Sequence, residues 1–119
     1  MAFPAAIRAL GDRLEIEQDP QVVDSILNSL ATFASPLAVE LILPCLRSGD
    51  AFKRNQAIEV LKSLPDVLAP FIEDLLQDPD PDVRIFMVNV LESLRHPNVV
   101  SWLINVIHND THTNVCATA

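Results

Sequence analysis

The stretch from Asp78 to Leu94, DPDPDVRIFMVNVLESL, decides how this chain folds. An acidic turn opens it, the pair Val83-Arg84 follows, and apolar residues then recur at steps of three and four. This spacing places Val83, Met87 and Leu91 on one face of a helix. The aspartates of the turn stand where a helix start needs side-chain caps or negative charge. The stretch therefore predicts a helix with one buried face.

The same pattern occurs at regular intervals elsewhere in the chain. Asp19, Asp50, Asp80 and Asp110 mark the starts of successive units, with spacings of 31, 30 and 30 residues. Each unit reads as two short amphipathic helices. The first helix of each unit is expected to end near a proline, namely Pro36, Pro65 or Pro97. No window alternates between apolar and polar residues for long, so no sheet is expected and the chain is predicted to be all-α.

The units divide the chain into a single domain, 1–119, of stacked helix pairs. Full repeats are expected at 19–49, 50–79 and 80–109, with half repeats at 3–18 and 110–119. Neither end carries the polar cap of a terminal repeat. We therefore expect a piece of a longer repeat protein, or ends that pack against other chains, including copies of this one. Pro44 is expected to kink its helix, and Pro70 is expected in a first helical turn.

Composition narrows the possible partners. The chain has 119 residues, half of them hydrophobic, and its formal net charge is −8. Such an acidic chain should repel nucleic acid and anionic membrane surfaces, so neither is predicted as a partner. The two cysteines fit a reducing compartment, and the sequence contains no apolar run of signal-peptide or membrane-spanning length. The expected location is the cytoplasm.

A two-helix repeat of about 30 residues with an aspartate-rich turn and a following Val-Arg pair resembles the HEAT-repeat family. It is most similar to the short bacterial repeats related to those of phycobilisome bilin lyases. The best match is Asp78–Leu94, whereas the middle unit has Lys53-Arg54 at the Val-Arg position and the first unit has Val23-Asp24 there. The resemblance implies a right-handed α-solenoid, with first helices on the convex face and second helices on the concave face.

The resemblance also implies a structural ladder of charged residues. Arg54 and Arg84 would reach aspartates in the turns of adjacent repeats, and the candidate aspartates are Asp50, Asp80 and Asp82. An arginine beside carboxylates at a helix start also satisfies exposed turn groups.

The concave face is where a partner is expected. Aligning the repeats gives a polar stripe of mixed charge there: Arg8, Asp12, Glu40, Arg47, Glu73, Asp74, Gln77, Ser101, Trp102, Asn105 and His108. One interpretation is a groove for a peptide or helix of another protein. The other is a solvated surface whose binding face lies elsewhere in a parent protein. Trp102 is expected in the core, although exposure in the groove would make it an interface anchor.

The predicted function is a non-catalytic scaffold for interaction with another protein or peptide. No Gly-x-Ser-x-Gly elbow and no phosphate-binding loop occurs, and no cofactor is predicted. His108, Asp110, His112 and Cys116 resemble metal ligands but do not share one continuous helix face, so no metal is predicted. The alternative is a lyase-like or chaperone-like subunit for a bilin or another cofactor, which only the repeat subtype suggests.

Overall fold

The computed structural model describes residues 3–118, which form eight α-helices and one short 3₁₀ helix without any strand. The helices are α1 (Phe3–Ile16), α2 (Pro20–Phe33), α3 (Pro36–Ile42), η1 (Leu43–Arg47), α4 (Ala51–Lys62), α5 (Pro65–Leu75), α6 (Pro81–Ser93), α7 (Val99–Asn109) and α8 (Thr113–Thr118). The all-α prediction is confirmed. Of the predicted domain 1–119, Met1, Ala2 and Ala119 lie outside the described residues.

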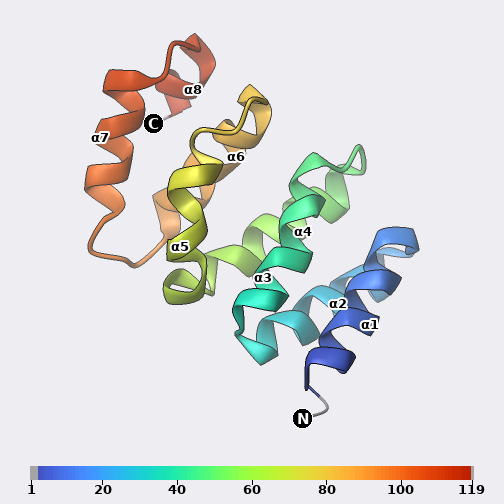
Figure 1. Cartoon of the computed structure of the whole chain (residues 1–119). Helices are drawn as coiled ribbons and strands as arrows, with labels where there is room; N and C mark the ends of the chain where they lie inside the picture. The colour runs from blue at the N-terminus through green and yellow to red at the C-terminus, as the bar shows by residue number, and fades with distance from the viewer. Residues whose placement is uncertain (1–2, 119) are drawn as a thin grey trace.

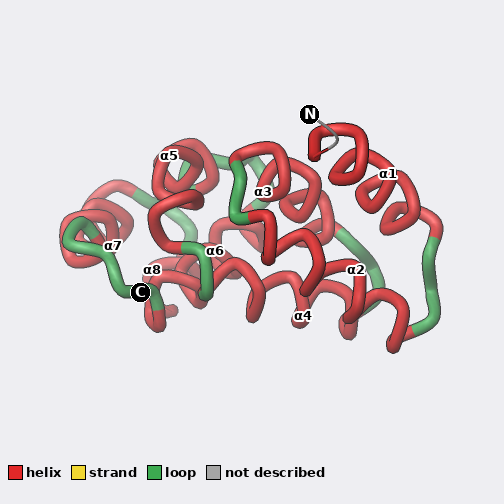
Figure 2. Tube along the Cα trace, turned by 90° about the horizontal axis from the view of Figure 1, so that it is seen from below, coloured by secondary structure: helices red, strands yellow, loops and turns green. Residues whose placement is uncertain are grey.

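The helices alternate between two rows. Helices α2, α4, α6 and α8 form one row, in which each helix packs on the next, and α1, α3 and α5 form the other in the same way. Helix α7 lies at the end of this second row and packs on α6 and α8 (Figure 2). The chain advances through the rows so that its two ends lie at opposite ends of the molecule (Figure 1). The molecule measures 43 × 29 × 21 Å.

The core lies between the two rows and is entirely apolar among the described residues. The first helices contribute side chains at the predicted spacing, including the fully buried Leu27, Leu61 and Leu91. The second helices contribute Ile42 from α3 and Ile72 from α5. Because each helix buries only one stripe, its opposite face stays exposed.

Aspartates start the first helices of the repeats. Asp19, Asp50 and Asp80 each precede a helix, and each side chain accepts a hydrogen bond from the amide two residues later. This satisfies one of the amides that a helix start leaves unpaired. Asp82 instead lies exposed in the first turn of α6, where its negative charge interacts favourably with the positive end of the helix dipole.

Pro44 and Pro70 occur in the second helices, and the structure confirms the prediction for one of them only. Helix α3 ends at Ile42 and tightens into η1, whose second residue is Pro44, so the expected distortion is confirmed. Pro70 lies in the interior of α5 rather than in its first turn, so that prediction was wrong. The reason is that Pro65 takes the first helical position, where a missing N–H costs nothing.

Candidate interaction groove between α5 and α7

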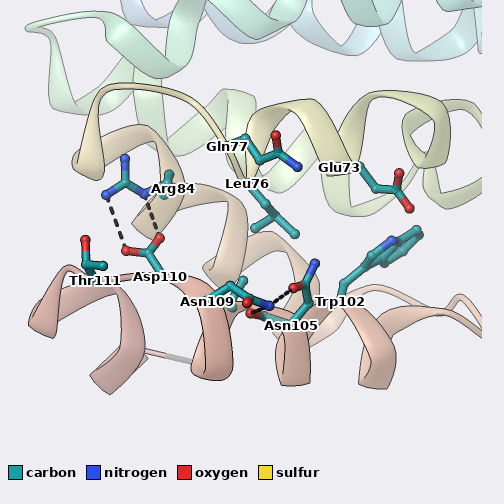
Figure 3. A pocket seen from close by; sticks show the side chains of 10 residues that line it. Glu73, Leu76, Gln77, Arg84, Trp102, Asn105, Asn109, Asp110 and Thr111 are labelled. Carbon is teal, nitrogen blue, oxygen red and sulfur yellow. Dashed lines mark hydrogen bonds and ion pairs between the residues drawn. The ribbon is translucent and has the colours of Figure 1, made fainter.

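A groove of about 550 Å³ lies between α5 and α7, with part of α6 at one end. Its lining combines carboxylates, amides and a few apolar side chains (Figure 3): Glu73, Leu76, Gln77, Arg84, Trp102, Asn105, Val106, Asn109, Asp110 and Thr111. A cavity of this volume lies within the range of ligand pockets.

Helical spacing places these side chains in the groove. Glu73 lies in the last turn of α5, and Leu76 and Gln77 follow it by three and four residues, in the turn just after the helix, where they line the same groove. The same spacing on α7 aligns Trp102, Asn105 and Asn109 on the opposite wall. Helix α7 packs on α6 and α8, and a channel remains on its α5 side.

An ion pair closes one end of the groove. Arg84 Nε lies 2.7 Å from Asp110 Oδ2, and the side chains of Arg84 and Asp110 are only 15% and 7% exposed. Arg84 also donates from Nη1 to the backbone oxygen of Asp78 over 2.6 Å. Burial raises the pKa of Asp110, but the amide hydrogen bond from His112 and the contact with Arg84 outweigh burial and leave this pKa below its ordinary value. This end of the groove therefore carries two charges that cancel.

Amide side chains line the middle of the groove. Asn109 donates from Nδ2 to the backbone oxygen of Asn105 over 3.1 Å, and it also contacts the Asn105 side-chain oxygen. Gln77 lies exposed on the opposite wall, and within residues 3–118 its side chain has no hydrogen-bond partner. Each primary amide carries both donors and an acceptor. The two walls can therefore bond to both kinds of backbone group in a bound chain.

Glu73 and Trp102 form the other end (Figure 3). Glu73 is exposed, and no ion pair of the described residues includes it. Trp102 is 6% exposed and stacks on His96 with 5.0 Å between ring centroids. The expectation that Trp102 packs in the core is confirmed, and its remaining surface also borders the groove.

The predicted polar stripe does not form one continuous lining. Glu73, Gln77, Trp102 and Asn105 line the groove together. The other members are exposed residues that do not line it: Arg8 and Asp12 on α1, Glu40 on α3, Arg47 in η1, Asp74 on α5, and Ser101 and His108 on α7. Arg47 is engaged elsewhere, because it forms an ion pair with Asp78 that lowers the pKa of that carboxyl.

The two arginines of the predicted ladder behave differently. Arg84 reaches Asp110 in the following turn, as the resemblance implies. Arg54 forms no ion pair within residues 3–118. Like Arg84, it donates to the backbone oxygen of the residue six positions earlier, Ser48, over 2.9 Å, and its guanidinium lies 5.2 Å from the centre of the Phe86 ring.

None of the three aspartates of the predicted ladder pairs with Arg54 or Arg84 within residues 3–118. Asp50 and Asp80 use their side chains to cap their own helices, and Asp82 is exposed in the first turn of α6. Arg47, and not Arg54, engages Asp78. Arg54 is left with its Nε buried and without a hydrogen-bond partner.

Several groove residues were not among the predicted site residues. Asn109 and Val106 lie on the same face of α7 as Trp102 and Asn105, so helical spacing could have indicated them. Arg84 was assigned a structural role only, and Asp110 was considered only as a weak metal ligand. No local pattern shows that α5 and α7 leave space between them, because that spacing depends on how both helices pack on α6.

A smaller cavity of about 280 Å³ lies between α1 and the α3–η1 segment. Cys45 borders it, and burial raises the pKa of this thiol. Lys53 donates from its ammonium group to the backbone oxygen of Leu14, near the C-terminal end of α1. Gly11 allows a close approach here, since a Cβ atom at this position would lie 2.8 Å from the Leu41 side chain. The lysine and the glycine therefore help to dock α1 on the following helices.

The His108–Cys116 region does not gather metal ligands. Within residues 3–118, no group of three or more histidine, cysteine or carboxylate side chains could hold a metal ion. Asp110 is engaged by Arg84, and the Cys116 thiol lies 3.1 Å from the backbone oxygen of Asp110.

Comparison with protein-family models, curated proteins and solved structures found no match to this chain. None of the helices between residues 3 and 118 is both long and apolar enough to span a membrane.

Proposed function

We propose that this chain is a non-catalytic interaction scaffold, a HEAT-like right-handed α-solenoid whose α5–α7 groove binds an extended peptide segment of another protein. The observation that carries this proposal is the groove itself, in which amide side chains face one another from α7 and from the turn after α5. It is the place where four members of the predicted binding stripe meet.

Recurring hydrogen bonds support the solenoid. Arg54 and Arg84 lie 30 residues apart, and each donates to the backbone oxygen of the residue six positions earlier. Asp50 and Asp80 cap α4 and α6 in the same way. Equivalent residues thus make equivalent contacts in successive units, as expected of stacked repeats. In this arrangement the second helices form the concave face, which includes both walls of the groove.

The size and chemistry of the groove favour an extended segment. Trp102 and Asn109 are separated by seven residues of helix, a rise of about 10 Å. About three residues of extended chain cover that length. An extended segment brings unpaired N–H and C=O groups, and side-chain amides can donate to and accept from them. The binding mode would thus pair peptide backbone with Gln77, Asn105 and Asn109.

Selection from a displayed library of random linear peptides tests the proposal. The groove variant changes Gln77→Lys and Asn105→Lys, which removes one amide from each wall. The control variant changes Gln18→Lys and Asn55→Lys, two exposed residues outside the groove. Both variants therefore alter the same residue types and the same net charge.

Peptides selected on the unaltered chain should bind the groove variant at least about tenfold more weakly, a difference of about 1.4 kcal/mol, and bind the control normally. Equal binding to both variants, or a selection that yields no binder, would contradict a peptide groove.

The sequence also suggested a cofactor-handling subunit and self-association through the ends of the solenoid. A cofactor-handling subunit would need a reactive thiol near a wide apolar groove, whereas Cys45 and Cys116 are absent from the groove lining, so we do not propose this function. Self-association through the solenoid ends stays a prediction. Light scattering over a range of concentrations tests it, and a constant monomer mass would contradict it.

A further inference from the structure

We propose that the α5–α7 groove selects peptides that carry a lysine or arginine side chain, whose charged group would lie beside Glu73. This inference rests on the proposed function, because it names the chemistry of the segment that the groove takes.

The charges of the groove lining favour a cation. Glu73, Arg84 and Asp110 are the charged residues of the lining, and Arg84 and Asp110 neutralise each other. Among the described residues, the carboxylate of Glu73 therefore has no counter-charge, and the neighbouring Asp74 is exposed and also acidic. The net charge of −8 adds a long-range attraction for basic segments.

The position of Glu73 strengthens this preference. It lies in the last turn of α5, which ends at Leu75. The aligned peptide groups of a helix give its C-terminus a partial negative charge, which attracts cations. A positive charge beside Glu73 would therefore meet a carboxylate and the negative end of a helix dipole together.

Apolar surface next to Glu73 fits the stem of a long basic side chain. Leu76 and Trp102 line the groove beside Glu73 (Figure 3). Lysine and arginine pack their methylene groups on such surfaces while the charged end reaches a polar partner. An aspartate or glutamate of the peptide at this position would be repelled by the carboxylate of Glu73. The site thus discriminates against acidic segments as well as favouring basic ones.

The test uses the peptides selected on the unaltered chain, together with two matched variants. Glu73→Gln removes the charge in the groove, and Glu92→Gln removes the charge of an exposed glutamate on α6. Trp102 is the only tryptophan of the chain, so its fluorescence reports binding at this end of the groove.

We expect the selected peptides to be enriched in lysine and arginine relative to the unselected library. Glu73→Gln should weaken their binding about three- to tenfold, and Glu92→Gln should not. Replacing the basic peptide residue by glutamine should cause a similar loss, and the two losses should not add, because they remove one interaction.

Two results would overturn the inference while leaving the proposed function intact. One is a set of groove-binding peptides without basic enrichment. The other is basic peptides that bind Glu73→Gln as well as the unaltered chain. Failure of the proposed function differs from both, since binding would then be insensitive to the Gln77→Lys and Asn105→Lys changes.

Discussion

Arg84 links three segments of the chain through one guanidinium group. It pairs with Asp110 after α7 and donates to the backbone oxygen of Asp78 before α6. Changing Arg84→Gln would leave the nearly buried carboxylate of Asp110 without its cation. We expect the free energy of unfolding, measured by urea denaturation, to fall by about 1–3 kcal/mol.

Arg95→Gln is the matched control, because Arg95 is exposed and no ion pair of the described residues includes it. Its effect should stay within about 0.5 kcal/mol. Equal losses in the two variants would show that the Arg84 contacts contribute nothing specific.

The lowered pKa of Asp110 predicts a pH dependence of stability. The folded chain holds this carboxyl more strongly in its charged form than the unfolded chain does. The stabilisation is therefore complete well above the ordinary pKa of aspartate, about 3.9, and is lost as pH falls below it. Urea denaturation should show a stability deficit of Asp110→Asn that is constant near neutral pH and shrinks in acid. A deficit that persists unchanged at the lowest pH would contradict the shift.

At the scale of a single element, α2 ends in a strained residue. Ala34 has φ 45° and ψ 44°, the left-handed conformation that side chains with a Cβ disfavour. Its amide still donates to the backbone oxygen of Ala31. Because glycine adopts this conformation without strain, Ala34→Gly should raise the free energy of unfolding by about 0.5–1 kcal/mol.

The control for this prediction is Ala6→Gly, at an exposed position inside α1. There glycine should lower stability by about 0.5–1 kcal/mol, because it loses more backbone freedom on folding. A loss of stability in both variants, measured by urea denaturation, would show that Ala34 is not strained.

The helices themselves were largely predictable from local pattern. The apolar spacing and the capping aspartates indicated α2, α4 and α6, since both act within a few residues of the chain. The position of Pro70 was predicted wrongly. Proline is common in the first turn of a helix, but this preference does not indicate whether Pro65 or Pro70 occupies that turn. The contact of Arg54 with Phe86 joins two helices, so no local pattern indicates it.

At the scale of the whole molecule, the sequence pattern predicted which polar residues lie on the second helices. It did not predict the groove between two of these helices. Glu73 and Asn105 share a groove because α7 lies apart from α5 and packs on α6 and α8. Glu40 is also polar and exposed, yet it does not line this groove. Periodicity identifies the face of one helix, whereas a groove requires the distance between two helices.

Two rows of helices extend the chain over 43 Å, and its ends lie at opposite ends of the molecule (Figure 1). Helix α7 also exposes three large apolar side chains, Val100, Ile104 and Ile107, outside the groove lining. These three residues serve as a control surface in binding experiments. A peptide that binds only through non-specific hydrophobic contact would bind them rather than the polar groove.

The most direct measurement is an NMR titration of the isotope-labelled chain with a selected peptide, followed through its amide proton–nitrogen correlations. We expect the largest shifts at the side-chain amides of Gln77, Asn105 and Asn109 and at the indole N–H of Trp102. Shifts concentrated instead at Val100, Ile104 and Ile107, or on α1 and α3, would contradict the assignment of the α5–α7 groove as the binding site.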